Sequence, residues 1–165
     1  MGNRAVIITK DERIGVYVHW NGGRDSIEAF LTYCKIRNYR RPEQDNYGWA
    51  SLVTVISNFF GNTGSSIGVD TVEHLDCDNR DNGVYVIENW EIVGRKFFDR
   101  REQDCHDLLE MLVAIDEAQP KPIGEEEIKK LLSKLSTTND YWKTLLSKYN
   151  SNKETINKNE ETTKK

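Results

Sequence analysis

The residues with the clearest potential for chemistry form the run N-G-G-R-D-S at positions 21–26. Residues 16–18 before it are strand formers, and the apolar residues after it recur at helical spacing. A glycine-rich turn that enters a helix points free backbone N–H groups and the positive end of the helix dipole at one place. The run predicts either an anion site or a plain turn whose helix is capped by Asp25 or Ser26. Its members are Asn21, Gly22, Gly23, Arg24, Asp25 and Ser26.

The same run resembles the S-G-G-x-D-S loop of the PP-loop ATP pyrophosphatases, which holds the pyrophosphate of ATP. Gly22, Gly23, Asp25 and Ser26 match that pattern, and Asn21 stands where the family has its first serine. The resemblance implies a nucleotide ligand whose phosphate could pair with an arginine in the run. That family needs a parallel sheet of βαβ units, however, and the later strands here have the pattern of hairpins.

Two other groups of residues could bind metal. The acidic stretch 70–81 offers oxygen ligands, but in an EF-hand register that starts at Asp78, Arg80 would occupy the third ligand position. Aspartate also dominates tight turns, so we expect a loop without a metal. The second group is His74, Cys77, Cys105 and His106. Neighbouring residues on a helix point about 100° apart, which makes joint chelation by the last two awkward.

Nothing in the chain forms a complete catalytic set. His19 could act as a general base, but no serine or cysteine beside it forms a nucleophile pair. We therefore predict a protein that is not an enzyme and that carries no metal and no cofactor.

Basic residues occur with aromatic residues in two clusters. The first holds Lys35, Arg37, Arg40 and Arg41 with Tyr33 and Tyr39, and the second holds Arg95, Lys96, Arg100 and Arg101 with Phe97 and Phe98. Such a mixture suits a phosphate backbone or an acidic protein groove, although it is also typical of a solvated surface. Exposed aromatic and arginine side chains dominate interface energetics. Besides the 21–26 run, the binding candidates are Trp20, Arg40, Arg41 and Trp90.

Length and composition limit the remaining choices. A chain of 165 residues can bury one proper core, and its net charge of −4 gives no global attraction to nucleic acid or to an anionic membrane. Cys34, Cys77 and Cys105 are widely spaced and odd in number, which indicates free thiols in a reducing compartment. No long apolar run is present, so we expect a cytoplasmic protein without a membrane partner. The oligomeric state stays open.

Hydrophobic periodicity and turn residues predict the order of the elements. Strands are expected at 5–9, 14–19, 84–88 and 91–97, with a turn at 89–90, and helices at 25–38, 47–60, 103–117, 125–135 and 141–149. We predict an α+β fold in which an antiparallel sheet of four or five strands packs against helices, with a helical C-terminal extension. The expected parts are a core domain at 1–119, the extension at 120–149 and a disordered tail at 150–165.

Three segments, M-G-N-R-A-V-I, H-W-N-G-G-R-D-S-I-E-A-F-L and L-D-C-D-N-R-D-N-G-V-Y-V-I, resemble a family of small proteins of phages and mobile elements in Gram-positive bacteria. The resemblance spans roughly residues 1–118. It implies an accessory protein, and anti-defence inhibitors such as the anti-CRISPR proteins that block Cas9 are frequent among these. The expected function is a non-enzymatic interaction protein that binds a host defence protein or its nucleic-acid complex. The alternative is a nucleotide- or phosphate-binding protein that uses the 21–26 turn, either a PP-loop-like ATP-using enzyme or a sponge for nucleotide signals.

Overall fold

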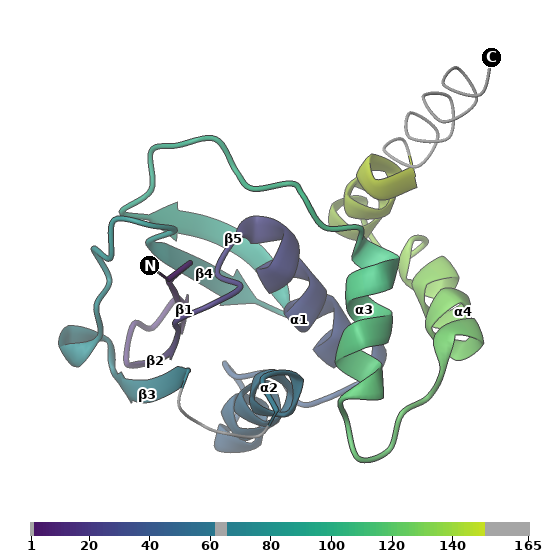
Figure 1. The fold of residues 1–165 in the computed structure, drawn as a ribbon, viewed down its shortest axis with the longest axis horizontal. Helices are drawn as coiled ribbons and strands as arrows, with labels where there is room; N and C mark the ends of the chain where they lie inside the picture. The colour runs from purple at the N-terminus through teal and green to yellow at the C-terminus, as the bar shows by residue number, and fades with distance from the viewer. Residues whose placement is uncertain (1, 62–65, 151–165) are drawn as a thin grey trace. The chain divides into compact units, whose positions relative to one another are not determined.

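The computed structural model describes residues 2–61 and 66–150, and its centre is a five-stranded sheet (Figure 1). The strands are β1 (Ala5–Thr9), β2 (Ile14–Val18), β3 (Ile67–Thr71), β4 (Val84–Glu88) and β5 (Glu91–Lys96). Their order across the sheet is β3-β2-β1-β4-β5.

The α+β class is confirmed, and the sheet is mostly antiparallel. One pairing differs from the expectation, because β1 and β4 run parallel. The chain reaches β4 only after β2, two helices and β3, so it returns beside β1 in the same direction instead of closing a hairpin. The hairpins β1–β2 and β4–β5 form as expected.

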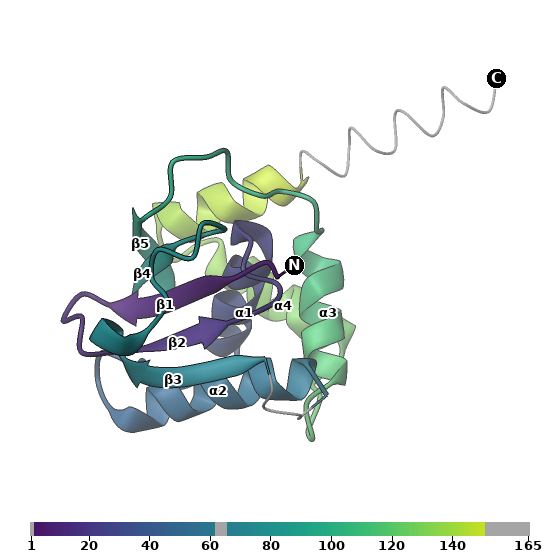
Figure 2. The ribbon, with the colours of Figure 1, turned by 60° about the vertical axis from the view of Figure 1, so that its left-hand side comes forward.

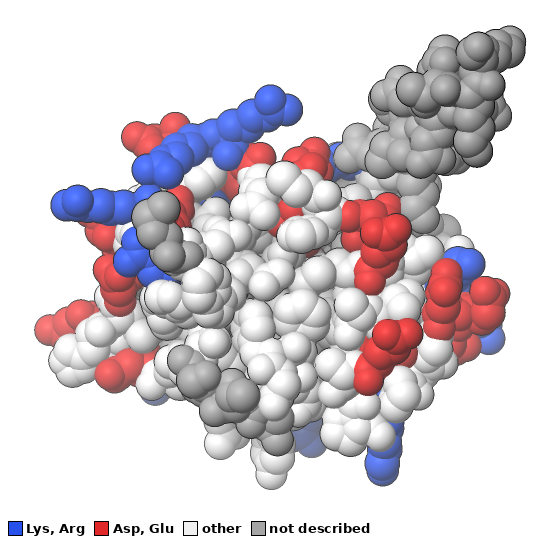
Figure 3. Space-filling view, viewed as in Figure 1, with Lys and Arg blue, Asp and Glu red and all other residues white. Residues whose placement is uncertain are grey.

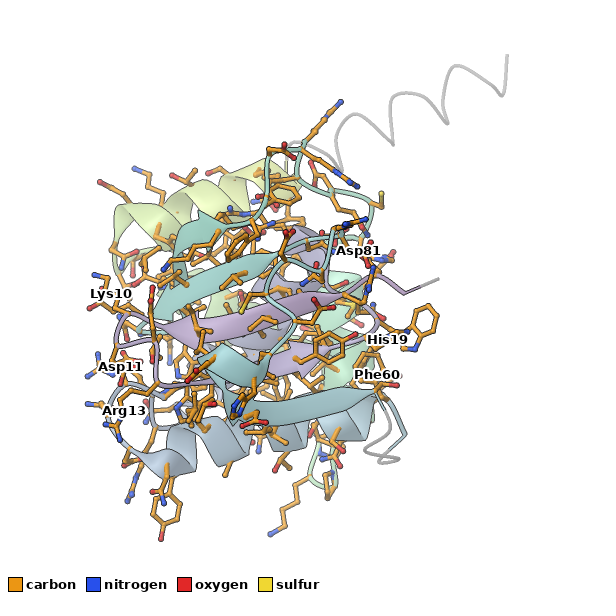
Figure 4. The ribbon with its side chains drawn as sticks, turned by 90° about the vertical axis from the view of Figure 1, so that its left-hand side faces the viewer. Lys10, Asp11, Arg13, His19, Phe60 and Asp81 are labelled. Carbon is orange, nitrogen blue, oxygen red and sulfur yellow. The ribbon has the colours of Figure 1, made fainter. Side chains whose placement is uncertain are left out.

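Three helices lie on one side of this sheet: the first two contact it, and the third packs against those two (Figures 1 and 2). They are α1 (Arg24–Ile36), α2 (Asn46–Phe59) and α3 (Leu108–Glu117). The opposite face carries Val6 and Ile8 of β1 packed against Val84 and Val86 of β4. A short 3₁₀ turn, η1 (Val72–His74), and the residues after it partly cover that second face, which Figure 4 shows towards the viewer.

The ends of the strands give the first unit two distinct poles. His19 and Asp81 lie at one end of the sheet, and Lys10, Asp11 and Arg13 lie at the other (Figure 4). Because α1 follows β2 through a tight turn, it starts at the first pole and ends at the second. The two ends of this helix therefore belong to different surfaces.

The bounds of α2 agree with the prediction to within one residue at each end. Asp45 caps it, since its carboxylate accepts hydrogen bonds from the backbone N–H groups of Tyr47 and Gly48. By contrast, α3 starts at Leu108 and not at 103. Residues 103–106 make hydrogen bonds with the start of α1 instead of forming a helical turn, and Asp107 then caps α3.

The chain divides into two compact units, Met1–Gly124 and Glu125–Lys165. The first unit keeps residues 120–124 because the backbone N–H groups of Ile123 and Gly124 donate to Asp116 on α3. The second unit holds α4 (Glu125–Leu135) and a helix at 140–150, as the periodicity predicts. Apart from Asn150, the expected disordered tail lies outside the described residues. Of the helices that the structure describes, none combines the length and the apolar composition needed to cross a bilayer.

Candidate binding surface

The glycine pair before α1 is closed in by other parts of the chain. The N–H of Gly22 donates to the carbonyl of Asn3 (2.8 Å), and the hydroxyl of Tyr85 on β4 donates to the carbonyl of Gly22 (2.7 Å). A Cβ atom at Gly22 would lie 2.4 Å from the Asn3 oxygen, and one at Gly23 would lie 2.6 Å from the side chain of Gln103. The glycines are required here by close packing.

Asp25 does not cap α1, so the capping prediction is wrong. The cap residue is Gly23, and Asp25 is 1% exposed inside the first turn. Its carboxylate accepts from the N–H groups of Cys105 (2.8 Å) and His106 (2.9 Å), which ties the 103–106 segment to the helix. This contact explains why Asp25 does not cap the helix: a buried carboxylate needs hydrogen-bond donors, and the N–H groups of residues 105 and 106 supply them.

Two of the first-turn donors that an anion would need already have partners in the chain. The N–H of Asp25 donates to the carbonyl of Gln103 (3.3 Å), and that of Ser26 donates to the Asp25 carboxylate (2.7 Å). Asn21 donates through its amide to the buried hydroxyl of Ser26 (3.2 Å). The Arg24 guanidinium pairs with Glu28 at 2.6 Å and with Glu102 at 3.7 Å. This end of α1 is filled and internally neutralised.

The two tryptophans proposed as contacts differ in exposure. Trp20 is 43% exposed and meets the ring of His19 edge-on, with centroids 4.8 Å apart. Trp90 is 1% exposed, so its expected place on the surface is wrong. Asn89 and Trp90 form the predicted tight turn with φ of 53° and 64°, and the indole N–H donates to the carbonyl of Tyr39 (3.1 Å). Trp90 therefore supports the 39–41 segment from within.

At the C-terminal end of α1 the first basic cluster is open to solvent. The Arg40 side chain is 65% exposed and lies over the ring of Tyr47, 4.8 Å from its centroid. Tyr47 is itself 64% exposed. Arg40 also pairs with Asp45 at 3.3 Å, and Arg41 lies 3.7 Å from Glu43. An exposed tyrosine stacked with an arginine is a preorganised contact of the kind that interfaces use.

Two neighbouring cavities open at this end, and Tyr39 lines both. The cavity of about 370 Å³ lies between α2 and the 119–121 segment and is lined by Arg37, Tyr39, Tyr47, Ala50, Ser51, Thr54, Val55, Asn58, Gln119, Pro120 and Lys121. The cavity of about 310 Å³ is lined by Lys35, Asn38, Tyr39, Arg40, Arg41, Gln44, Asn89 and Trp90. We call these residues together the cationic–aromatic surface. Among the described residues, its lining includes five basic side chains and no acidic one.

A buried polar network holds the larger cavity in shape. The hydroxyl of Tyr33 donates to Asp116 (2.8 Å), while Arg37 donates to that hydroxyl and to the carbonyl of Lys121 (both 3.0 Å). Burial alone would raise the pKa of Asp116, but hydrogen bonds from Ile123, Gly124 and Tyr33 outweigh it, so the pKa is lowered. Asp116 therefore stays charged and fixes the 120–124 segment against α1.

The second basic cluster is partly structural. The Arg95 guanidinium lies 3.7 Å from the ring centroid of Tyr85 and 4.0 Å from that of Phe98, and it pairs with Glu102 at 2.9 Å. It also donates to the backbone carbonyl groups of Asn82 and Val84. Arg100 and Arg101 are exposed in the segment that leads to the N-terminal end of α1. On the face shown in Figure 3, basic side chains gather at the upper left beside acidic ones, and the middle of the face is uncharged.

The acidic stretch 70–81 uses its carboxylates for internal contacts. Asp81 accepts from the Arg4 guanidinium at 2.7 Å, and this hydrogen bond holds the pKa of Asp81 below its ordinary value. Asp70 lies 3.5 Å from His74. Within residues 2–61 and 66–150, no three His, Cys, Asp or Glu side chains gather as a metal site would require. Cys34, Cys77 and Cys105 are free thiols.

The sequence indicated the cluster at 35–41 but missed its surroundings. Tyr47, Asn89 and Lys121 complete the surface, and the chain brings them there from three separate elements. The only local signal was the Asn89 turn, which predicts a hairpin but not a contact with Lys35 or Arg41. The 119–121 segment lies close to α1 because of Asp116, and the sequence pattern marks Asp116 only as an ordinary polar position on a helix.

A scan against models of protein families, a search of curated proteins and a search of solved structures each find no match for this chain.

Proposed function

We propose that this chain is a non-enzymatic interaction protein that docks on a host defence protein, or on its nucleic-acid complex, through the cationic–aromatic surface. The observation that carries the proposal is the exposed stack of Arg40 on Tyr47 beside two cavities with a basic, acid-free lining. Arginine and tyrosine are the residue types that most often dominate binding energy when a partner buries them.

The exposure of these side chains supports a role outside the fold. Tyr47 is 64% exposed and the Arg40 side chain 65% exposed, so neither contributes much burial to the stability of the domain. An exposed aromatic residue on a rigid helix loses little conformational entropy on binding, which favours affinity. The anti-defence assignment itself rests on the sequence resemblance.

The charge of the surface favours an anionic partner. The whole chain carries a net charge of −4, so the local excess of basic groups at the C-terminal end of α1 is not a general property of the molecule. A defence effector that holds RNA or DNA presents phosphate groups, and an acidic protein groove presents carboxylates. Either would complement Arg37, Arg40 and Lys121.

The nucleotide alternative at the 21–26 turn has less support. The N–H groups of Gly22, Asp25 and Ser26 are engaged by Asn3, Gln103 and the Asp25 carboxylate, and Arg24 is paired with two glutamates. An anion there would have to displace part of the 103–106 segment before it could bind.

The test uses a panel of purified Gram-positive defence effectors, including a Cas9–guide RNA complex. Binding is measured by biolayer interferometry, and target cleavage is measured in the same samples. We expect the wild-type chain to bind and inhibit at least one effector. The double substitution Arg40→Ala/Tyr47→Ala is expected to weaken that binding by at least about tenfold, or about 1.4 kcal/mol.

The matched control is Phe97→Ala/Arg101→Ala, which removes an exposed aromatic residue and an exposed arginine from the second basic cluster. We expect it to bind as the wild type does. The proposal fails if no effector of the panel is bound, or if the control loses as much affinity as the Arg40/Tyr47 variant.

A further inference from the structure

The smaller cavity of the cationic–aromatic surface has the lining of an anion site. Lys35 comes from the last turn of α1, Arg40 and Arg41 follow the helix, and Asn89 comes from the β4–β5 turn. The other polar side chains on its wall are those of Asn38, Tyr39 and Gln44. Of the described residues that line it, none carries a negative charge.

Two of these cations converge on one neutral atom. The Lys35 ammonium donates to Asn89 Oδ1 at 3.0 Å, and Arg41 Nη1 donates to the same oxygen at 3.5 Å. In the part of the chain that the structure describes, no carboxylate lies within 4.0 Å of Lys35 Nζ. Two positive groups that share one amide oxygen repel each other, and an anionic oxygen between them would remove that repulsion.

Nearby carboxylates oppose this positive potential. Glu43 lies 3.7 Å from Arg41 and Asp45 lies 3.3 Å from Arg40, and both carboxylates stand outside the cavity lining. The C-terminal carbonyl groups of α1 contribute the equivalent of about half a negative charge. A third carboxylate, that of Glu91, accepts from the Asn89 amide at 3.3 Å. Three positive charges therefore face three carboxylates, and the contact of Lys35 is with a neutral oxygen.

The cavity is also held in place before any ligand enters. The Asn89 N–H donates to Glu43 at 2.8 Å and its amide to Glu91 at 3.3 Å, which orients Oδ1 towards the two cations. The Trp90 indole donates to the carbonyl of Tyr39 beneath the 39–41 segment. A site that is already ordered loses little conformational entropy on binding.

We infer that this cavity binds a terminal phosphate group, held by Lys35 and Arg41 in place of their shared contact with Asn89. A hollow of about 310 Å³ admits a phosphomonoester, which carries between one and two negative charges, more readily than the flanked, singly charged phosphodiester of a nucleic-acid backbone. The arginine can meet two phosphate oxygens while the lysine acts as a point charge. The inference goes beyond the proposed function, because a free nucleotide would satisfy it as well as the phosphorylated end of a nucleic acid.

Isothermal titration calorimetry with three probes tests the inference and identifies the source of the phosphate. The probes are AMP, a short single-stranded oligonucleotide with a 5′-phosphate and the same oligonucleotide with a 5′-hydroxyl. Binding of AMP alone points to a free nucleotide, and tighter binding of the 5′-phosphorylated strand points to a nucleic-acid end. The inference is overturned if neither AMP nor the phosphorylated strand binds, or if the 5′-hydroxyl strand binds as well as the phosphorylated one.

Variants locate the site. Lys35→Gln/Arg41→Gln is expected to lower the affinity for the phosphate probe at least tenfold. Arg41→Lys is expected to lower it less, because lysine keeps the charge but lacks the paired N–H donors of the guanidinium. The control Arg100→Gln/Arg101→Gln removes the same charge from the segment near the other end of α1 and should bind as the wild type does. Circular dichroism checks that each variant is folded. Equal losses in the control and in the Lys35/Arg41 variant would show general electrostatic attraction and overturn the assignment.

Discussion

At its N-terminal end, α1 is closed over by the 103–106 segment, whereas at its C-terminal end three basic side chains line an open cavity. Arg24 and Asp25 at the first end each meet several partners within the chain. Arg40 and Tyr47 at the second end keep most of their surface in solvent. Similar residue types are therefore structural at one end of a helix and available for contact at the other.

The two ends of α1 differ because another segment of the chain passes over only one of them. The long connection from β5 to α3 passes the first end and supplies carbonyl and N–H groups to it. At the second end the chain only turns, through Asn38 with φ of 55°, into the cap of α2. A glycine-rich run thus marks close packing, and the exposed polar positions beyond the helix mark the surface that stays free. Four variants probe this contrast.

The largest effect is expected for Asp25→Ala. It removes the buried carboxylate that accepts from the N–H groups of Cys105 and His106, so two hydrogen bonds to a charged group are lost and the free energy of unfolding should fall by about 3 kcal/mol. Urea denaturation followed by tryptophan fluorescence measures the change. A loss below about 1 kcal/mol would mean that the 103–106 segment is not fixed by this carboxylate.

Gly22→Ala should follow with a loss of about 2 kcal/mol, because its new methyl group would overlap the carbonyl of Asn3. The same denaturation experiment applies. The matched control is Gly61→Ala, where a Cβ meets no atom within 4 Å although φ is 78°. If Gly22→Ala destabilises the protein no more than this control does, the close packing at the start of α1 is contradicted.

A comparable effect, with a pH dependence, is expected for Asp116→Asn at the C-terminal end. The pKa of Asp116 lies below its value of about 3.9 in the unfolded chain, so its stabilising contribution is present above that pH and disappears as the pH falls through the folded pKa. At pH 7 the variant should be less stable by about 2 kcal/mol, and the gap should narrow below about pH 4. Urea midpoints across this range test it, and a gap that stays constant on acidification would contradict the account.

The smallest effect on stability is expected for Lys35→Gln/Arg41→Gln, within about 0.5 kcal/mol of the wild type, because both side chains are partly exposed and neither is buried against the core. Thermal denaturation is the measurement. A loss above about 1.5 kcal/mol would show that the two cations belong to the fold, like Arg24 and Asp25, and would remove the contrast between the ends of α1.

Periodicity was sufficient to predict most of the elements. The α2 stripe, the β4–β5 hairpin at Asn89–Trp90 and the start of α4 appear where the pattern places them. The predicted start of α3 was wrong. The residue types at 103–106 are compatible with a helix, but this segment makes hydrogen bonds with Asp25, which lies 80 residues away in the chain. The parallel β1–β4 pair also depends on long-range topology that no local pattern contains.

The candidate surface was predictable only in part. The basic cluster at 35–41 is contiguous and can be recognised, but its role depends on Asn89, Tyr47 and Lys121, which the fold brings from elsewhere. For Trp90 the sequence predicted a surface contact that the fold does not provide. Its residue type is typical of interfaces, yet a turn with positive φ places its indole inside, where it donates to Tyr39.

The central claim is that ligands meet this protein at the C-terminal end of α1. Amide chemical shifts of the ¹⁵N-labelled full chain, recorded while AMP is added, test it most directly. The account predicts shift changes at residues 38–41 and 89–91 that are absent from Lys35→Gln/Arg41→Gln. Changes centred on residues 21–26 instead would contradict it, and so would the absence of changes with both AMP and the 5′-phosphorylated oligonucleotide.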